Sequence, residues 1–278
     1  AGGGLIADGA PGQVFGRARA ELTAAGVWLP SHRLDSAPGG LAGSGSATSR
    51  TGAESSPTAV ALTVDRVRLR YPRAEVDAVS DASLRLPAGV ATAVIGGNGS
   101  GKSTLALMAA GLLAPTGGRA FAADRPAQPM HRRRASSLVR AVGTVFQNPE
   151  HQFLTTSVRS ELALAPGRLG WSTARVAARV EELLERLELT ALAEANPFTL
   201  SGGQKRRLSV ATALSAAAPV LILDEPTFGQ DARTWAALAE LLDAARDDGH
   251  ALLIVSHDEE FVARVADDVR VMTAGRLA

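Results

Sequence analysis

Residues 96–103 have the types and spacing of a phosphate-binding loop. They read Gly-Gly-Asn-Gly-Ser-Gly-Lys-Ser, which fits the pattern G-x-x-x-x-G-K-S. Glycines there let backbone N–H groups turn toward phosphate oxygens, and a helix that starts at the end of the loop adds the positive end of its dipole. We expect Lys102 to reach the outer phosphates and Ser103 to offer its hydroxyl to Mg²⁺. A glycine-rich turn without a ligand is the alternative, but the complete match favours a nucleoside triphosphate site.

Two adjacent carboxylates, Asp224 and Glu225, follow the apolar run of residues 220–223. A dry interior cannot hold both charges unless a cation or a polar ligand compensates them. We therefore expect Asp224 to hold a magnesium ion through water, and Glu225 to orient or deprotonate an attacking water. The alternative is a solvated strand end that binds nothing.

A second helix start that could bind an anion lies at residues 200–204, which read Leu-Ser-Gly-Gly-Gln. Ser201 can cap a helix that continues to Leu214, because a serine hydroxyl accepts a hydrogen bond from the free N–H groups of the first turn. Gly202 and Gly203 let those N–H groups approach an anion closely. The sequence therefore predicts a second phosphate-binding end, with an ordinary helix start as the alternative.

The overall composition narrows the class of protein. The 278 residues carry 29 basic and 28 acidic side chains, so the net charge of +1 gives no reason to expect nucleic acid or an anionic membrane surface as a partner. Without cysteine, neither a disulfide nor a thiolate metal site can form. The apolar runs are far shorter than the ~20 residues that a membrane-spanning helix needs. We expect a folded globular domain that binds any metal through oxygen.

Hydrophobic periodicity indicates the strands that must position these motifs. Apolar and polar residues alternate in residues 60–69 and 79–86, as they do in an antiparallel sheet with one buried face. Residues 90–95, 220–223 and 252–255 are short apolar runs, typical of parallel strands that are covered on both faces. The phosphate loop and the carboxylate pair each follow one of these runs.

Helical spacing of apolar residues appears in two places. Residues 104–113 follow the phosphate loop, and residues 176–187 follow Ser172, which can cap a helix with one apolar stripe. Residues 150–200 are therefore predicted to form a helical insertion. Residues 35–58 are rich in Gly, Ser, Ala and Thr, with little to bury, and are predicted to be a flexible linker.

The motif at residues 200–204 resembles the signature sequence of ABC ATPases. The resemblance implies an α/β fold, a P-loop ABC ATPase domain over residues 59–278 with a mostly parallel core sheet and an antiparallel β subdomain. It also implies a helical subdomain at about residues 150–203. In that family the helix start at Ser201 completes the ATP site of the opposite subunit, so a second ABC cassette is expected as the partner in a head-to-tail dimer.

The remaining elements of the family match single positions. Gln147 resembles the Q-loop glutamine, which touches Mg²⁺ and a moving lobe, and His257 resembles the switch histidine, which can bond to the γ-phosphate. Asp231 matches the D-loop aspartate. Tyr71 precedes Pro72 where the family places an aromatic ring against adenine. Taken alone, a glutamine, histidine or tyrosine at such a position would more often be structural.

The predicted site follows from the motifs and the resemblance together. The catalytic residues are expected to be Lys102, Gln147, Glu225 and His257, and the metal ligands Ser103, Gln147 and Asp224. The residues expected to contact ATP are Tyr71, Gly96, Asn98, Gly99, Ser100, Gly101, Lys102, Ser103, Thr104, Ser201, Gly202, Gly203, Gln204 and Asp231.

Residues 146–153 and 200–207 are similar to the ATPases of energy-coupling-factor importers, and residues 225–231 resemble the same branch. This resemblance implies a Mg²⁺-dependent ATPase that drives uptake of a vitamin or of cobalt or nickel ions. It implies a membrane coupling subunit and a substrate-binding membrane protein as partners, and a peripheral position on the cytoplasmic face of the membrane. The substrate would be chosen by another subunit.

Two other functions stay open at this point. One is a soluble ABC protein that acts on ribosomes or DNA, since the fold is shared across these functions. The other is the ATPase of an exporter or of a different importer branch.

Residues 132–134 are three consecutive arginines. They could bind a polyanion, but so short a run is usually a solvated face.

The start of the chain resembles its end. Residues 4–7 read Gly-Leu-Ile-Ala and residues 275–278 read Gly-Arg-Leu-Ala. With the linker that follows, this similarity suggests that residues 1–34 are the tail of a preceding cassette, so that the natural protein carries two cassettes in tandem.

Overall fold

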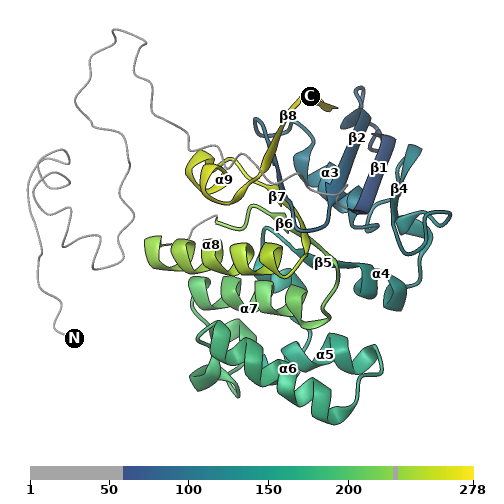
Figure 1. The fold of residues 1–278 in the computed structure, drawn as a ribbon. Helices are drawn as coiled ribbons and strands as arrows, with labels where there is room; N and C mark the ends of the chain where they lie inside the picture. The colour runs from purple at the N-terminus through teal and green to yellow at the C-terminus, as the bar shows by residue number, and fades with distance from the viewer. Residues whose placement is uncertain (1–58, 228–230) are drawn as a thin grey trace, which may run out of the picture. The chain divides into compact units, whose positions relative to one another are not determined.

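The computed structural model describes residues 59–227 and 231–278, and in them the strands form two sheets (Figure 1). A three-stranded sheet has the order β2-β1-β4, and a six-stranded sheet has the order β5-β6-β7-β3-β8-β9. The strands are β1 (Val60–Leu69), β2 (Val79–Pro87), β3 (Ala91–Ile95), β4 (Gly117–Ala122), β5 (Val142–Val145), β6 (Val220–Asp224), β7 (Ala251–Val255), β8 (Asp268–Thr273) and β9 (Arg276–Leu277).

Helices connect the strands and extend away from the larger sheet. The α-helices are α3 (Lys102–Ala109), α4 (Ala135–Ala141), α5 (Val158–Arg168), α6 (Thr173–Arg186), α7 (Gly202–Ser215), α8 (Ala232–Asp247) and α9 (Glu259–Val265). Short 3₁₀ turns lie at Met130–Arg132, Pro149–Gln152, Thr190–Leu192 and Pro197–Thr199. Between β5 and β6 the chain forms helices and loops but no strand, and α5 and α6 lie together below α7 in Figure 1.

The four strands β5, β6, β7 and β3 of the six-stranded sheet are buried on both faces, whereas β8 and β9 are largely exposed. β5, β6, β7, β3 and β8 are parallel, and only the short β9 runs antiparallel to β8. Within β6, Leu221 and Leu223 pack into one apolar cluster, and Val220 and Ile222 pack into another. Because alternate residues of a strand point to opposite faces, both faces need apolar side chains, which explains the uninterrupted run. The predicted parallel strands are confirmed.

The two apolar clusters cover the two faces of this sheet. The first cluster includes residues of α5, α6, α7 and α8, and the second includes residues of α3 and of the smaller sheet. The smaller sheet is antiparallel throughout, with β1 paired to both β2 and β4. The predicted antiparallel pair is therefore confirmed, and it packs against the face that carries the phosphate-loop helix α3.

The helix after the phosphate loop is shorter than predicted. It ends at Ala109 rather than at residue 113, because the backbone turns at Gly111, whose φ is +76°. A Cβ added at Gly111 would lie 2.8 Å from Met130, so a side chain there has no room. The other predicted helix is confirmed: Ser172 caps α6 by accepting a bond from N of Arg175 at 3.3 Å.

The three consecutive arginines do not form one solvated face. Arg133 is buried, and its Nη1 donates to Asp124 Oδ1 at 2.9 Å, whereas Arg132 and Arg134 are exposed. The prediction of a solvated face was wrong for Arg133 because this side chain tethers the turn after β4. The predicted cassette tail (residues 1–34) and linker (35–58) lie outside the described residues.

No helix in the described part of the chain is long and apolar enough to cross a membrane.

Candidate functional site

The phosphate loop lies between β3 and α3, and two of its glycines are required by the backbone. Gly96 has φ +149°, and a Cβ there would lie 2.2 Å from the carbonyl oxygen of Met272. Gly101 has φ +105°, and a Cβ there would lie 2.3 Å from the carbonyl oxygen of Ala78. The backbone of β8 and of the residue just before β2 therefore lies close against the loop, and only glycine fits at these two positions.

The outer side of the loop is open. A Cβ built at Gly97 or Gly99 would meet nothing within 4 Å, and Asn98 is exposed. Ser100 is buried, its hydroxyl has no partner among the described residues, and its carbonyl oxygen accepts from N of Gly275 at 2.9 Å. The loop is thus held on one side by neighbouring backbone and is open to solvent on the other side, where its backbone N–H groups can bind a phosphate.

Lys102 lies across this loop. Its side chain is buried, and Nζ donates to the carbonyl oxygens of Gly96 at 2.8 Å and Gly97 at 3.0 Å. An ammonium group carries three N–H donors, so one remains for a ligand at the loop. The positive charge is therefore fixed where the negative charge of a triphosphate would lie.

Ser103 and Asp224 are brought together from positions 121 residues apart. Ser103 Oγ donates to Asp224 Oδ1 at 3.0 Å. Burial raises the pKa of Asp224 above its usual 3.8 and the neighbouring Glu225 adds to this, while the bond from Ser103 and the charges of Lys102 and Arg206 oppose it. A cation next to Asp224 would relieve the cost of burying this carboxylate.

The oxygen donors at this position suit Mg²⁺. Among residues 59–227 and 231–278 no group of three or more His, Asp or Glu side chains could hold a metal. A Mg²⁺ ion commonly takes one or two protein carboxylates and completes its octahedron with phosphates and water. Ser103 and Asp224 fit that role, and they would hold the ion only together with a phosphate ligand.

Glu225 follows β6 and is nearly buried, at 8% exposure. Its Oε2 accepts from Nδ1 of His257 at 2.8 Å and from N of His257 at 3.4 Å. Its φ is +48°, an uncommon conformation for a residue with a side chain, and such strain is concentrated at functional sites. The imidazole of His257 is largely exposed, so this pair joins an inner carboxylate to an outer ring that a ligand can reach.

Tyr71 and Thr104 connect the small sheet to the phosphate loop. The hydroxyl of Tyr71 lies 3.2 Å from Oγ1 of Thr104, which is in the first turn of α3. Tyr71 as a whole remains 42% exposed, so a ligand can reach it. The structure thus places the predicted adenine contact beside the predicted phosphate site.

The signature residues form a separate end. Ser201 caps α7, and its hydroxyl accepts from N of Gln204 while the Gln204 side chain accepts from N of Ser201 at 2.9 Å. Ser201 and Gly202 are exposed. In the described part of the chain no hydrogen bond joins residues 201–204 to the phosphate loop. The phosphate loop and the start of α7 are therefore not in contact within this chain, whereas Asp224 and Glu225 do contact Ser103 and His257.

Asp231, the predicted D-loop aspartate, is exposed and follows the undescribed residues 228–230.

Gln147 is exposed, and its backbone is held by a residue that the sequence analysis missed. Arg206 in α7 is 2% exposed, and its Nη1 and Nη2 donate to the carbonyl oxygens of Phe146 at 2.8 Å and Gln147 at 2.6 Å. Burial lowers the pKa of Arg206 to about 10, although the charges of Asp224 and Glu225 oppose this. The run of basic residues directly after Gln204 was the available signal.

Two further bonds tie the Gln147 segment to α7. Gln152 Oε1 accepts from N of Phe146 at 3.0 Å and from Oγ of Ser209, and Gln152 Nε2 donates to the carbonyl oxygen of Ser209 at 3.3 Å. Lys205 Nζ lies 2.5 Å from Glu150 Oε1. The helix that starts at Ser201 is therefore linked by side chains to the segment of residues 146–152.

Comparisons with known proteins agree with this geometry. A family model described as ABC transporter matches residues 79–228. The putative HMP/thiamine import ATP-binding protein YkoD of Bacillus subtilis is 42% identical, over 73% of this chain and 36% of its own length. The nickel import ATP-binding protein NikO of Rhodobacter capsulatus is 42% identical, over 73% of this chain and 82% of its own length. The chain therefore spans about a third of the first relative and most of the second.

Solved structures confirm the predicted fold class. The cbiO1 structure from Clostridium perfringens, described as part of the ABC transporter complex cbiONQ, has 31% identity and a TM-score of 0.69, covering 79% of this chain and 87% of that one. A dimeric post-hydrolysis structure of the ATP-binding cassette MJ0796, bound to ADP and Pi, has a TM-score of 0.69 over 78% of this chain and 96% of that one. Its identity is 24%, so this second likeness concerns the fold alone.

Proposed function

This chain belongs to the ABC transporter family, and from that premise we propose that it is the ATP-binding and ATP-hydrolysing motor of an energy-coupling-factor type importer. The observation that carries the proposal is the pairing of two sites at one edge of the parallel sheet. Ser103 contacts Asp224, and His257 contacts Glu225. The first pair suits a metal bound to the phosphates, and the second suits an attacking water.

In this proposal the phosphate loop binds and orients ATP. Backbone N–H groups of residues 97–103 and the N-terminus of α3 face the phosphates, and Lys102 adds a fixed positive charge. Ser103, Asp224 and Gln147 are the residues that would hold Mg²⁺, which when bound neutralises charge that develops on the phosphates. Tyr71 stacks on adenine, a contact of roughly 1–3 kcal/mol by analogy with base stacking.

Glu225 is the proposed general base. Its carboxylate is nearly buried and held by the segment after β7, so its position is fixed before the reaction. It orients a water for attack on the γ-phosphorus and takes up a proton from it, while His257 donates from the outer side to a γ-phosphate oxygen. The reaction needs both groups close together, and the neighbouring parallel strands β6 and β7 bring them together.

The second phosphate-binding end points to a second cassette. Ser201 and Gly202 are exposed at the start of α7, a helix of 14 residues whose N-terminus carries the positive end of its dipole. We propose that they bind the γ-phosphate of ATP held by another cassette, on a separate chain or in the same polypeptide. Asp231 would contribute to the same interface.

Membrane partners are proposed to dock near residues 147–161. The side chain of Leu154 lies on the surface, and the residue is 77% exposed. Its backbone is held in place, because the N–H groups of Leu154 and Thr155 donate to the buried carboxylate of Glu161, at 2.9 and 2.8 Å. Phe198, which is half exposed, packs edge-on against Phe153 with ring centroids 6.0 Å apart. We infer that these exposed apolar side chains lie at the contact with a membrane partner.

The cargo class follows only from relatives. YkoD, NikO and the cobalt import ATP-binding protein CbiO of Rhodobacter capsulatus are import ATPases by name, and their named cargoes are HMP or thiamine, nickel and cobalt. We propose a vitamin or a transition-metal ion as cargo, selected by a separate membrane protein. The motor would sit on the cytoplasmic face of the membrane, held there by a coupling subunit.

The proposal is tested by the substitution Glu225→Gln. The variant should bind ATP with unchanged affinity, lose about 10²–10⁴-fold in kcat, and accumulate as an ATP-bound dimer with its complementary cassette. Turnover is followed by phosphate release and dimer formation by light scattering. Glu185→Gln, an exposed change in α6, is the matched control and should behave as the parent. Parental turnover in Glu225→Gln would refute the assigned base.

A further inference from the structure

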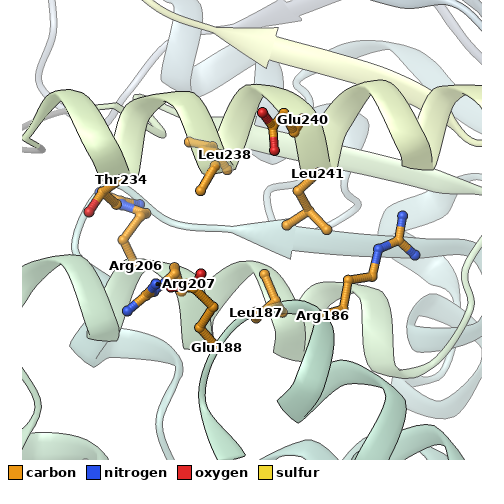
Figure 2. A pocket seen from close by; sticks show the side chains of 10 residues that line it. Arg186, Leu187, Glu188, Arg206, Arg207, Thr234, Leu238, Glu240 and Leu241 are labelled. Atoms are coloured by element: carbon orange, nitrogen blue, oxygen red, sulfur yellow. Dashed lines mark hydrogen bonds and ion pairs between the residues drawn. The ribbon is translucent and has the colours of Figure 1, made fainter.

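A pocket of about 250 Å³ lies between the end of α6, the first half of α7 and the middle of α8 (Figure 2). Leu187, Leu238 and Leu241 form its apolar wall, and the two leucines of α8 point down toward Leu187 in Figure 2. Arg206 and Arg207 of α7 line it as well. An apolar pocket with a few polar groups is the usual form of a small-molecule site.

The two arginines have donors left over. Arg206 uses Nη1 and Nη2 on the carbonyl oxygens of Phe146 and Gln147, but its Nε is buried and has no partner among the described residues. The side chain of Arg207 bonds to Glu188 through Nη1 at 2.9 Å, and its Nε is likewise buried without a partner. Buried N–H groups are almost always paired, so these two indicate an acceptor that belongs in this region.

The charge of Arg206 points to an anion as that acceptor. In the described residues no carboxylate forms an ion pair with Arg206, whose direct partners are two neutral carbonyl groups. Its pKa of about 10 keeps it protonated at neutral pH even though burial lowers that pKa. The charges of Asp224 and Glu225 attract this guanidinium, but neither carboxylate bonds to it directly, so an anion in the pocket would be its directly bonded counter-ion.

We propose that this pocket binds a small organic monocarboxylate. Its carboxylate would accept hydrogen bonds from the guanidinium groups of Arg206 and Arg207, and its apolar part would pack on Leu187, Leu238 and Leu241. A dianion such as phosphate fits less well, because Glu188 and Glu240 also line the pocket and repel a second negative charge. The small volume favours an aliphatic chain or a single ring.

Occupancy of the pocket would act on the Gln147 segment. The same guanidinium that faces the pocket holds the backbone of Phe146 and Gln147, so an anion that fixes Arg206 also fixes that segment. This consequence rests on the proposed role of Gln147 in ATP binding, whereas carboxylate binding itself does not. By linkage, ATP and the carboxylate would then change each other's affinity by the same factor.

The test measures binding without nucleotide. The chain is titrated with butyrate, hexanoate and benzoate by calorimetry and thermal unfolding, with 1-hexanol and hexylamine as uncharged and cationic controls. At least one carboxylate should bind saturably and raise Tm by a few degrees, and neither control should. The proposal is wrong if all three carboxylates fail to bind, or if hexanol binds as well as hexanoate.

Variants locate the binding. Ala237→Leu fills the pocket from α8 without altering any charge, and should abolish carboxylate binding while leaving Tm within a few degrees of the parent. Ala236→Leu makes the same change one residue earlier, at an exposed position that does not line the pocket, and should bind as the parent does. Arg206→Lys keeps the charge but lacks Nε, and should weaken binding at least tenfold. Undiminished binding in Ala237→Leu would overturn the proposal.

A second experiment tests whether carboxylate binding affects the affinity for ATP. In the parent, saturating hexanoate should change the affinity for ATP at least threefold, and in Ala237→Leu it should not. Carboxylate binding without any effect on ATP would leave the site in place and refute its coupling to Gln147. A Glu225→Gln variant with parental turnover would instead refute the proposed function, whatever the pocket binds.

Discussion

Nδ1 of His257 lies 2.8 Å from Oε2 of Glu225, although the two residues are 32 positions apart in the chain. The contact exists because β6 and β7 are parallel neighbours, with Asp224 opposite Val255, so the residues that follow each strand meet at one edge. The ring is 58% exposed and the carboxylate 10% exposed. A phosphate that approaches this edge therefore meets the imidazole first and the carboxylate behind it.

The first prediction concerns His257. Replacing it with alanine removes the outer donor but leaves the buried carboxylate and the phosphate loop, so kcat should fall on the order of 10²-fold while the affinity for ATP stays within about threefold. Steady-state phosphate release and equilibrium binding of a fluorescent ATP analogue measure the two quantities.

A matched histidine controls for general effects of the change. His250 lies just before β7, where its Nδ1 is 2.7 Å from the carbonyl oxygen of Ala218. His250→Ala should cost about 1 kcal/mol in the free energy of unfolding and leave kcat unchanged. Equal losses of kcat in the two variants would show that His257 has no special role.

The second prediction concerns the pH dependence contributed by Asp224. Burial raises its pKa in the folded protein above 3.8, so the folded state binds this proton more tightly than the unfolded state does. From 3.8 upward to the raised pKa, the free energy of unfolding therefore falls as pH rises, and above that window the penalty is fully present. Asp224→Asn removes the penalty, and its Tm at about pH 7 should exceed that of the parent, in the absence of nucleotide, by up to a few degrees.

The same variant should lose its response to metal. At a fixed concentration of ATP, adding Mg²⁺ should raise the Tm of the parent and EDTA should reverse that rise, whereas the Tm of Asp224→Asn should respond to neither. Its advantage in Tm should also shrink as the pH is lowered through the raised pKa of Asp224, where the parent carboxylate takes up its proton. A parent that is more stable than Asp224→Asn at neutral pH would contradict the assigned cost of burial.

The sequence predicted those parts of the site whose pattern is local. The run before Asp224 is apolar throughout because both faces of β6 are buried, and this pattern can be recognised in the sequence alone. The contact of Arg206 with Phe146, across 60 positions, cannot be predicted from the sequence, since it depends on how the helices between β5 and β6 fold back on the sheet. The early end of α3 involves tertiary structure too, because the turn at Gly111 packs so closely on Met130 that a side chain at residue 111 has no room.

The third prediction separates two glycines of the phosphate loop. Gly101→Ala places a Cβ 2.3 Å from the carbonyl oxygen of Ala78 and at a φ of +105°, so the loop must shift. We expect a loss of about 2–4 kcal/mol in the free energy of unfolding and a loss of ATP binding. Denaturant unfolding and ATP titration measure the two effects.

Gly97→Ala serves as its control, because a Cβ there meets nothing within 4 Å. The free energy of unfolding of this variant should stay within about 0.5 kcal/mol of the parent. If Gly101→Ala proved as stable as Gly97→Ala, the close approach of the Ala78 backbone would not be what requires glycine at that position.

The fourth prediction concerns docking on the membrane subunit. Leu154 is held outward by backbone bonds to Glu161, so Leu154→Asp should leave the fold and the ATPase activity of the isolated chain unchanged within about twofold. Burying the new carboxylate in an interface would be costly, and substrate uptake by the reconstituted transporter should fall at least tenfold. Leu112→Asp is the control, since Leu112 is also an exposed leucine but lies after α3, far along the chain from residues 147–161. Uptake that is lost equally in both variants, or in neither, would mean that Leu154 does not contact the coupling subunit.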